Sequence, residues 1–346
     1  MRPCPQSRPP APARPIKPRL ALLLGAAVLA LACNRAPTPA PDDPEQPATI
    51  FPLPSATTPT DDSKWLQAGL PVPATDTAIE FVAFGDTGSG LPPQFEVAAS
   101  LLRHCQTRRC DLVTHVGDLI YPAGIAHAAD PLIEERVNRP YRGLVAPFFV
   151  ALGNHETYGS VDALIAWSSR LRIAGLVGEV PAVDLRLPAR WYTFVAGPVR
   201  FLALDSNLPS EDQARWAERV LADSVKAGTP WVIAFSHHPR RSYGPHGDAT
   251  ADLAAWYDRV LCGRVDLLIS GHDHDQQLLK PRCGVHQLVT GGGGASLRPS
   301  VKGEATVWAR SMHGFAHLRV DLSGIDVTIH GSNGGAAYTS HLDRAR

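Results

Sequence analysis

Long hydrophobic runs are missing from this chain of 346 residues, and so is a surplus of charge of either sign. No apolar stretch reaches the roughly 18 residues that a membrane-spanning helix needs, which excludes a protein with several membrane spans. Lysine and arginine number 33, and aspartate and glutamate also number 33. A hydrophobic content of 44% is nevertheless enough for a sizeable core, which excludes a wholly disordered chain.

The N-terminus is the one place where charge is distributed unevenly. Residues 1–19 carry five basic residues and no acidic one, and residues 20–32 are uncharged and apolar. A basic segment followed by a short apolar one is typical of a secretory signal. Ala32 precedes Cys33, as in bacterial lipoproteins, so we expect residues 1–32 to be removed and Cys33 to carry a lipid. The alternative is an ordinary signal peptide and a secreted protein. A lipoprotein would be exported and membrane-anchored, in the periplasm or at the cell surface.

Cysteine is scarce, and none of the six cysteines has the Cys-x-x-Cys spacing of a metal site. Beyond Cys33 there is an even number, which suits disulfide bonds in an oxidising compartment. These four are Cys105, Cys110, Cys262 and Cys283. They allow three pairings, and proximity in the sequence favours Cys105–Cys110 and Cys262–Cys283.

Proline marks the boundary of the folded part. Seventeen of the 32 prolines fall within residues 1–73, and residues 33–77 show little periodicity, so we expect a disordered tether there. Without residues 1–32, 28 basic residues stand against 33 acidic ones, a net charge of −5. This mildly acidic chain argues against nucleic acid as the main partner.

From residue 78 onward, short apolar runs alternate with amphipathic segments. Five runs end in polar clusters and are typical of buried strands: residues 78–86, 111–118, 146–155, 230–238 and 265–274. Helices are expected near 93–104, 211–226 and 250–261, and hairpins at 191–206 and 315–331. The alternation predicts an α/β fold, in which ligands bind outside the carboxyl ends of the strands.

Oxygen donors and imidazoles follow these five strands. Taken singly, each is explained by a turn or a solvated imidazole. Together at one edge of a sheet they supply the ligands that two adjacent metal ions need, and a carboxylate can bridge two ions about 3.5–4 Å apart. The residues are Asp86, Asp118, Tyr121, Asn154, His155, His237, His238, His272, Asp273 and His274.

The segments that carry these residues are GDTG (85–88), GDLIY (117–121), GNHE (153–156), SHHP (236–239) and GHDH (271–274). Their order and spacing resemble the five blocks of the calcineurin-like metallophosphoesterase superfamily. Most of that superfamily has Asp-x-His in the first block, whereas this chain has Asp86-Thr87-Gly88. In purple acid phosphatases a tyrosine three residues after the bridging aspartate replaces that histidine, and Tyr121 stands at this position. The chain therefore most resembles purple acid phosphatases, including the small tartrate-resistant type.

The resemblance implies a set of metal ligands and two further active-site histidines. It assigns one metal to Asp86, Asp118, Tyr121 and His274, and the other to Asp118, Asn154, His237 and His272. A phenolate is a hard donor, which favours Fe(III) at Tyr121; the second site would take Fe(II), Zn(II) or Mn(II). His155 would stabilise charge or protonate the leaving group, and His246 falls where small purple acid phosphatases place another active-site histidine. We expect His238 in the wall of the site or at the surface, and Asp273 orienting a ligand imidazole or its own turn.

The resemblance also implies the fold and the reaction. It predicts a four-layer α/β/β/α sandwich of two mixed sheets, with residues 78–346 as the catalytic domain. The expected reaction is hydrolysis of phosphomonoesters by a metal-bound hydroxide. Two alternatives stay open: cleavage of phosphodiesters or nucleotides at the same site, and a surface binding module that keeps its metals without catalysis. The expected partners are a phosphoester substrate and the membrane, with no protein partner. Residues 156–190 match no template.

Overall fold

The computed structural model describes residues 77–173 and 183–345. The expected leader, residues 1–32, and all but the last residue of the expected tether lie outside the described residues. No helix within these two ranges is long and apolar enough to cross a membrane.

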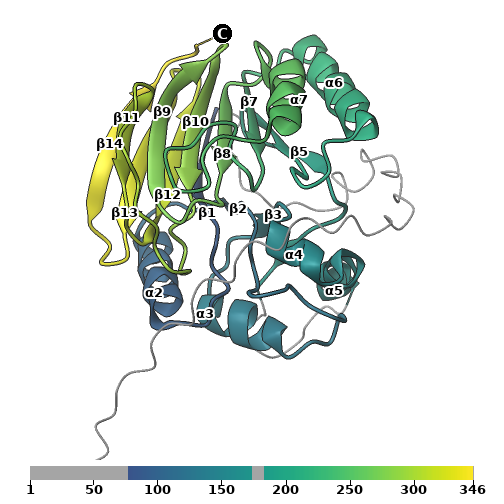
Figure 1. The fold of residues 1–346 in the computed structure, drawn as a ribbon, viewed down its shortest axis with the longest axis vertical. Helices are drawn as coiled ribbons and strands as arrows, with labels where there is room; N and C mark the ends of the chain where they lie inside the picture. The colour runs from purple at the N-terminus through teal and green to yellow at the C-terminus, as the bar shows by residue number, and fades with distance from the viewer. Residues whose placement is uncertain (1–76, 174–182, 346) are drawn as a thin grey trace, which may run out of the picture. The chain divides into compact units, whose positions relative to one another are not determined.

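Two mixed sheets of seven strands each form the centre of the fold (Figure 1). The first sheet has the order β14 (Ala336–Leu342), β13 (Ile325–Gly331), β12 (Gly314–Asp321), β1 (Ala78–Phe84), β2 (Leu112–His115), β3 (Phe148–Val150) and β4 (Leu185–Arg186). The second has the order β11 (Thr306–Arg310), β9 (Gln276–Arg282), β10 (Val285–Thr290), β8 (Leu267–Ser270), β7 (Trp231–Phe235), β6 (Val199–Ala203) and β5 (Tyr192–Ala196).

Each sheet is parallel over the strands that lead into the predicted site. In the first sheet β1, β2, β3 and β4 run parallel, and β12, β13 and β14 add antiparallel strands at one side. In the second, β6, β7, β8 and β10 run parallel, and β5, β9 and β11 are antiparallel to their neighbours. The carboxyl ends of β1, β2 and β3, and those of β7 and β8, therefore meet at a common edge within each sheet.

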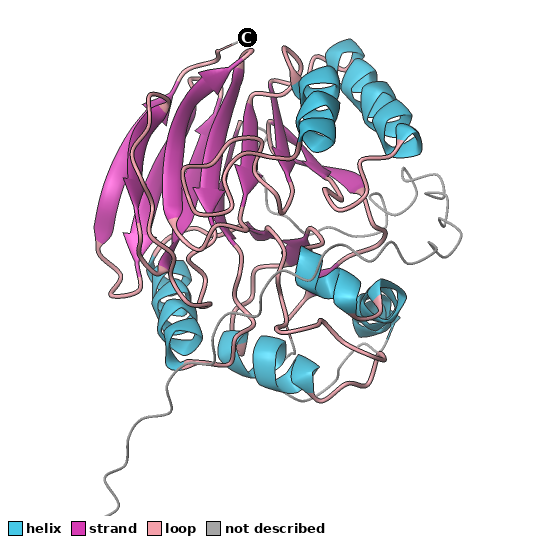
Figure 2. Ribbon diagram, in the orientation of Figure 1, coloured by secondary structure: helices cyan, strands magenta, loops and turns pink. Residues whose placement is uncertain are grey.

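Helices cover both sheets (Figures 1 and 2). On the side of the first sheet are α2 (Pro92–Thr107), the π-helical turn η1 (Glu134–Asn138), α3 (Arg139–Tyr141), α4 (Asn154–Tyr158) and α5 (Val161–Ile173). The second sheet carries α6 (Glu211–Lys226) and α7 (Ala251–Leu261), which bury Trp216 and Leu253 against Leu202 and Val232 of its strands. Between the sheets, the rings of Phe81 in β1 and Phe201 in β6 pack edge to face with centroids 5.2 Å apart. This is the α/β/β/α sandwich that the sequence predicts.

Most of the expected elements are present. The three expected helices appear as α2, α6 and α7, and the two hairpins as β5–β6 and β12–β13. The run 146–155 is a strand only as far as Val150, because Gly153 caps the N-terminus of α4 and turns the chain into a helix. Within residues 156–190, which match no template, the structure places α5 and β4. Both cysteine pairings favoured by proximity are present, Cys105–Cys110 and Cys262–Cys283.

Candidate metal centre

The predicted site residues follow β1, β2, β3, β7 and β8, on loops or, for Asn154 and His155, in the first turn of α4. The segments that follow the strands of the two sheets are joined to each other. The backbone N–H of His272, after β8, donates to Oδ1 and Oδ2 of Asp86, after β1, at 3.1 and 3.0 Å. The His237 side chain, after β7, reaches the backbone carbonyl of Val116 at 2.9 Å. These contacts bring carboxylates from one sheet and imidazoles from the other to a single place.

Backbone strain is concentrated at three of the predicted ligands. Asp86, Asp118 and His272 have φ values of 58°, 54° and 69°. Among the described residues, Cys283 is the one other non-glycine residue with a positive φ. Side chains rarely adopt this left-handed conformation, and such residues cluster at functional sites.

The first group of donors surrounds the hydroxyl of Tyr121. This hydroxyl lies 2.9 Å from Oδ2 of Asp118, 3.3 Å from Oδ1 of Asp86 and 3.2 Å from Nε2 of His274. The Nε2 atom of His274 is also 3.5 Å from Oδ1 of Asp86. Four donor atoms thus converge, and they are the four that the sequence assigns to the first metal.

A second group of donors lies on the other side of Asp118. Nε2 of His237 is 2.9 Å from Oδ1 of Asn154, 3.4 Å from Oδ2 of Asp118 and 3.2 Å from Nδ1 of His272. Because Oδ2 of Asp118 also contacts Tyr121, this carboxylate touches both groups, as a bridging ligand must.

Backbone carbonyls fix the tautomers of two imidazoles. The Nδ1 atom of His237 lies 2.9 Å from the carbonyl oxygen of Val116, and that of His274 lies 2.7 Å from the carbonyl oxygen of Ser296. A carbonyl oxygen can only accept, so both Nδ1 atoms carry hydrogen. The lone pair of each neutral ring is then on Nε2, the atom that faces the aspartates, which is the arrangement found around metal-binding histidines.

Burial sets the charge states of these side chains. It raises the pKa of Asp86 well above its usual range, and the nearby charge of Asp118 adds to this effect. Burial, followed by the charges of Asp118 and Asp86, likewise raises the pKa of Tyr121. Burial lowers the pKa of His237 to about 3 and that of His274 to about 4. A cation would reverse the cost of ionising the acids, because it becomes the largest local charge.

This donor set fits a pair of metal ions. Carboxylate, phenol, amide and neutral imidazole ligands suit iron, zinc and manganese. The ligand atoms of Asp86, Asp118 and His274 all lie within 4.8 Å of one another, as do those of His237, His238 and His272.

The other predicted histidines lie beside these groups. Nε2 of His155 is 3.8 Å from Oδ2 of Asp118, and its side chain is 24% exposed. The ring of His246 stacks on that of His272 with centroids 4.0 Å apart and an angle of 26°. The ring of His238 is 4.4 Å from that of His272, and its Nδ1 is 2.8 Å from Oγ of Ser206, so it lies in the wall of the site. All nine predicted catalytic and metal-binding residues are therefore brought together.

The expectation for Asp273 is wrong in its choice of partner. Among the described residues, neither ligand imidazole of GHDH nor its own turn donates a hydrogen bond to its carboxylate. It accepts a hydrogen bond from the backbone N–H of His246 at 3.1 Å and another from the hydroxyl of Ser242, both on a different loop.

Glu156 is a residue to which the sequence reasoning gives no role. Its buried carboxylate accepts backbone N–H bonds from Asp118 and Gly153 on Oε2, and from Leu119 and Ile120 on Oε1, at 2.8 to 3.3 Å. Burial, with the nearby charge of Asp118, raises the pKa of Glu156 to about 8. The carboxylate thus ties the loop of Asp118 to the start of α4. A glutamate at the third helical position, whose side chain accepts from the N-cap backbone, is the half of the capping box that points to it.

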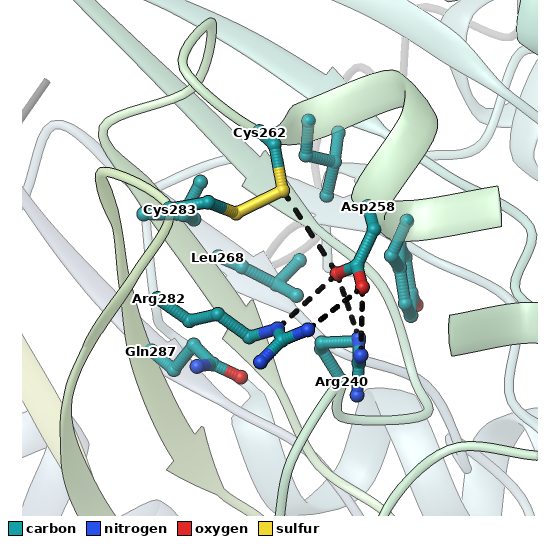
Figure 3. Close-up of a pocket in the computed structure, with 10 residues that line it drawn as sticks. Arg240, Asp258, Cys262, Leu268, Arg282, Cys283 and Gln287 are labelled. Carbon is teal, nitrogen blue, oxygen red and sulfur yellow. Dashed lines mark hydrogen bonds and ion pairs between the residues drawn. A yellow bond between two sulfur atoms is a disulfide. The ribbon is translucent and has the colours of Figure 1, made fainter. Parts of the chain in front are cut away.

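A separate pocket lies beside α7 and is lined by Tyr257, Asp258 and Leu261 of that helix (Figure 3). Asp258 accepts hydrogen bonds there from Arg240 and Arg282. The ligand atoms of Asp258, Cys262 and Cys283 lie within 4.8 Å of one another, but the two cysteines form a disulfide, which leaves no thiolate for a metal. None of the nine predicted site residues lines this pocket.

The fold and the converging donor groups define a metallophosphoesterase. The sequence profile named Calcineurin-like phosphoesterase matches residues 79–276. The chain belongs to this family, and it is a hydrolase. The resemblance, the fold and the enzyme class expected from the sequence are therefore confirmed.

Named relatives agree with this assignment. The chain is 24% identical over 317 residues to tartrate-resistant acid phosphatase type 5 of Mus musculus, an alignment that covers 81% of this chain and 95% of the relative. Two solved structures share the fold, each at 20% identity. GAP50, described as the anchor in the inner membrane complex of Plasmodium, has a TM-score of 0.65 and covers 78% of this chain and 90% of its own. Purple acid phosphatase PPD1 of yellow lupin (Lupinus luteus) has a TM-score of 0.59, with coverage of 80% and 55%.

Proposed function

We propose that the chain hydrolyses phosphomonoesters with two bound metal ions. The family is one of dimetal phosphoester hydrolases, and the named relatives include acid phosphatases. In this proposal one ion is held by Asp86, Asp118, Tyr121 and His274, and the other by Asp118, Asn154, His237 and His272.

The observation that carries the proposal is the position of the Tyr121 hydroxyl, within 3.3 Å of Asp86, Asp118 and His274. A phenolate is a hard, charged donor, so we assign Fe(III) to this site. The second site, with an amide oxygen and two imidazoles, suits Fe(II), Zn(II) or Mn(II). When bound, such a pair offsets the charge of a phosphoryl group and lowers the pKa of water between the ions.

His155 is placed to move a proton. Its Nδ1 donates a hydrogen bond to the carbonyl oxygen of Pro122, so this nitrogen carries hydrogen whether the imidazole is neutral or protonated. The exchangeable proton is on Nε2, the atom that faces Asp118. At this position a protonated imidazole can donate to a leaving alcohol oxygen. His246, held over the ring of His272, supplies a second group for the developing charge.

We also propose that the chain is exported and anchored by a lipid on Cys33. The order of basic segment, apolar segment, Ala32 and Cys33 supports this. Metabolic labelling with a radioactive fatty acid tests it, with Cys33→Ser as the control. Label in the parent chain alone supports the anchor, and no label in either chain contradicts it.

Turnover of p-nitrophenyl phosphate by the purified, metal-loaded chain tests the activity. The matched variant is Asp118→Asn, which keeps the shape of the bridging side chain and removes its charge. We expect a rate at least about 10²-fold lower in the variant and fewer than two metal ions per chain by elemental analysis.

Other outcomes select the alternatives. Faster turnover of bis(p-nitrophenyl) phosphate than of the monoester would indicate a phosphodiesterase. A chain that binds two metals and turns over no phosphoester would be a binding module.

A further inference from the structure

The segment between β7 and α7 carries His246 and is hydrogen-bonded to the rest of the molecule at several points, two of which involve the carboxylates of Asp258 and Asp273. Near its start, Arg240 donates to Asp258 of α7 from Nε at 2.9 Å and from Nη2 at 2.8 Å, as Figure 3 shows. Further along, the hydroxyl of Ser242 and the backbone N–H of His246 donate hydrogen bonds to Asp273. Asp273 lies between His272 and His274 on the loop after β8.

Asp273 is fully buried, and each of its carboxylate oxygens has one donor from this segment. Oδ1 accepts from the backbone N–H of His246 at 3.1 Å, and Oδ2 accepts from the hydroxyl of Ser242. The Ser242 oxygen in turn accepts from the backbone N–H of Gly244 at 3.0 Å and from Nε2 of Gln277 at 2.9 Å. Both lone pairs of the serine oxygen are therefore in use, and its hydrogen is committed to Asp273.

Gly244 is what lets the segment approach this carboxylate. A Cβ atom at Gly244 would lie 2.2 Å from Cγ of Asp273 and 2.4 Å from its Oδ1, a separation that no side chain tolerates. With glycine there, the segment closes on Asp273, and the ring of His246 stacks on the ring of His272.

We propose that Asp273 is a positioning residue for His246. It holds the His246 backbone at a fixed place relative to the neighbouring His272, and it acts through His246 without binding a metal. The inference rests on the proposed function, because it needs His246 to contact the phosphoester. Its physical basis is that both oxygens of Asp273 must accept. An asparagine here would turn an N–H group either toward the His246 amide or toward a serine oxygen with no free lone pair.

The test disturbs the contact from both sides. Asp273→Asn removes one acceptor, and Gly244→Ala pushes the segment away. We expect each variant to bind two metal ions per chain and to lose about 10-fold in kcat, with a smaller change in KM, because small displacements at a reacting centre are costly. Asp258→Asn is the matched control: it makes the same change at another attachment point, where the carboxylate accepts from Arg240 and not from His246, and we expect kcat to be unaffected.

A double-variant comparison separates positioning from a general structural role. When His246→Asn is already present, Asp273→Asn should lower kcat by less than about 2-fold, because the group that it positions is gone. If the loss in kcat of the double variant equals the product of the losses of His246→Asn and Asp273→Asn, the inference is wrong. It is also wrong if Asp273→Asn binds fewer than two metal ions. If Asp273→Asn does not fold, Gly244→Ala with and without His246→Asn decides by the same criteria.

Two results separate this inference from the function on which it rests. If the parent chain is active and Asp118→Asn is inactive, but His246→Asn leaves kcat unchanged, the inference is overturned and the phosphomonoesterase stands. If the parent chain itself turns over nothing with two metals bound, both fall.

Discussion

A Cβ atom on Gly88 would lie 2.0 Å from the carbonyl oxygen of Leu119. The loop after β1 therefore runs so close to the loop after β2 that no side chain fits at Gly88. The histidine that most of the superfamily carries in the first block would therefore not fit here. The Tyr121 hydroxyl, reaching from the second loop to within 3.3 Å of Asp86, supplies a donor beside that carboxylate instead.

The first prediction concerns Tyr121. Tyr121→Phe should remove the phenolate donor, lower the iron content per chain below that of the parent and abolish the visible absorption that an iron–tyrosinate pair gives. Adding Gly88→His should fail to restore either, because the loop has no room for the new side chain. Tyr338→Phe is the control and should keep both signals, because Tyr338 lies in β14 at the edge of the first sheet and stacks on Trp308 of β11 in the second. Recovery of iron in the double variant would contradict this reading.

The second prediction concerns Glu156. Glu156→Gln places an amide NH₂ where two backbone N–H groups now donate, which leaves buried donors without an acceptor. We expect the free energy of unfolding to fall by about 1–3 kcal/mol, measured by urea denaturation. Glu134→Gln is the control, because its ion pair with Arg142 is about half exposed and such pairs contribute little. Equal stability of the two variants would show that the contacts of Glu156 carry no net energy.

The third prediction compares the two disulfides. Cys262–Cys283 closes a sequence separation of 21 residues, and Cys105–Cys110 closes one of 5. In the chain-entropy account, the longer loop contributes about 3 kcal/mol and the shorter about 2 kcal/mol. Replacing each pair by two serines should therefore lower the free energy of unfolding more for Cys262–Cys283. The reverse order would indicate that native contacts, and not loop entropy, dominate.

The fourth prediction concerns three histidines outside the site. His104 of α2 packs its ring against those of His317 and His330, with centroids 4.7 and 4.6 Å apart. Burial, then the charges of His317, His330 and Arg108, lower the pKa of His104 to about 4, and burial also lowers the pKa of the other two. The unfolded chain, with histidine pKa values near 6.5, binds protons more readily at acid pH.

The contribution of these three histidines to the free energy of unfolding should thus be fully present above about pH 6.5 and should be lost as the pH falls toward 4. The measurement is the urea midpoint at several pH values for the parent and for His104→Gln. We expect the variant to show a weaker fall between pH 6.5 and 4. Parallel curves would mean that His104 is not responsible.

The sequence predicted what depends on local pattern. Apolar runs followed by Asp86, Asp118 and His237 mark strands that end in loops, and parallel strands carry such loops to one edge. That Tyr121 replaces the histidine of the first block could also be inferred from the sequence through the resemblance, because Tyr121 and Asp118 lie within one block. The same reasoning found the helices whose apolar faces repeat regularly, such as α6.

What it missed depends on contacts between distant segments. The hydrogen bond from the backbone N–H of His246 to the Asp273 carboxylate joins residues 27 positions apart, and nothing in the spacing of GHDH indicates it. Glu156 reaches 37 positions back to Leu119. Strands β4, β9, β11 and β14 also escaped prediction, because their pairing comes from neighbours in the sheet and not from an alternation of their own.

The left-handed backbone at Asp86, Asp118 and His272 has a consequence for how this chain can change. Each of these residues holds a conformation that glycine adopts without strain, so replacing it by glycine relieves backbone energy while removing a donor atom. Loss of hydrolysis and relief of backbone strain therefore lie in the same direction, and the apolar core between the two sheets contains none of these three residues. In a descendant without selection for catalysis, we expect these metal ligands to be lost before the α/β/β/α sandwich, and the remaining fold could then serve another function.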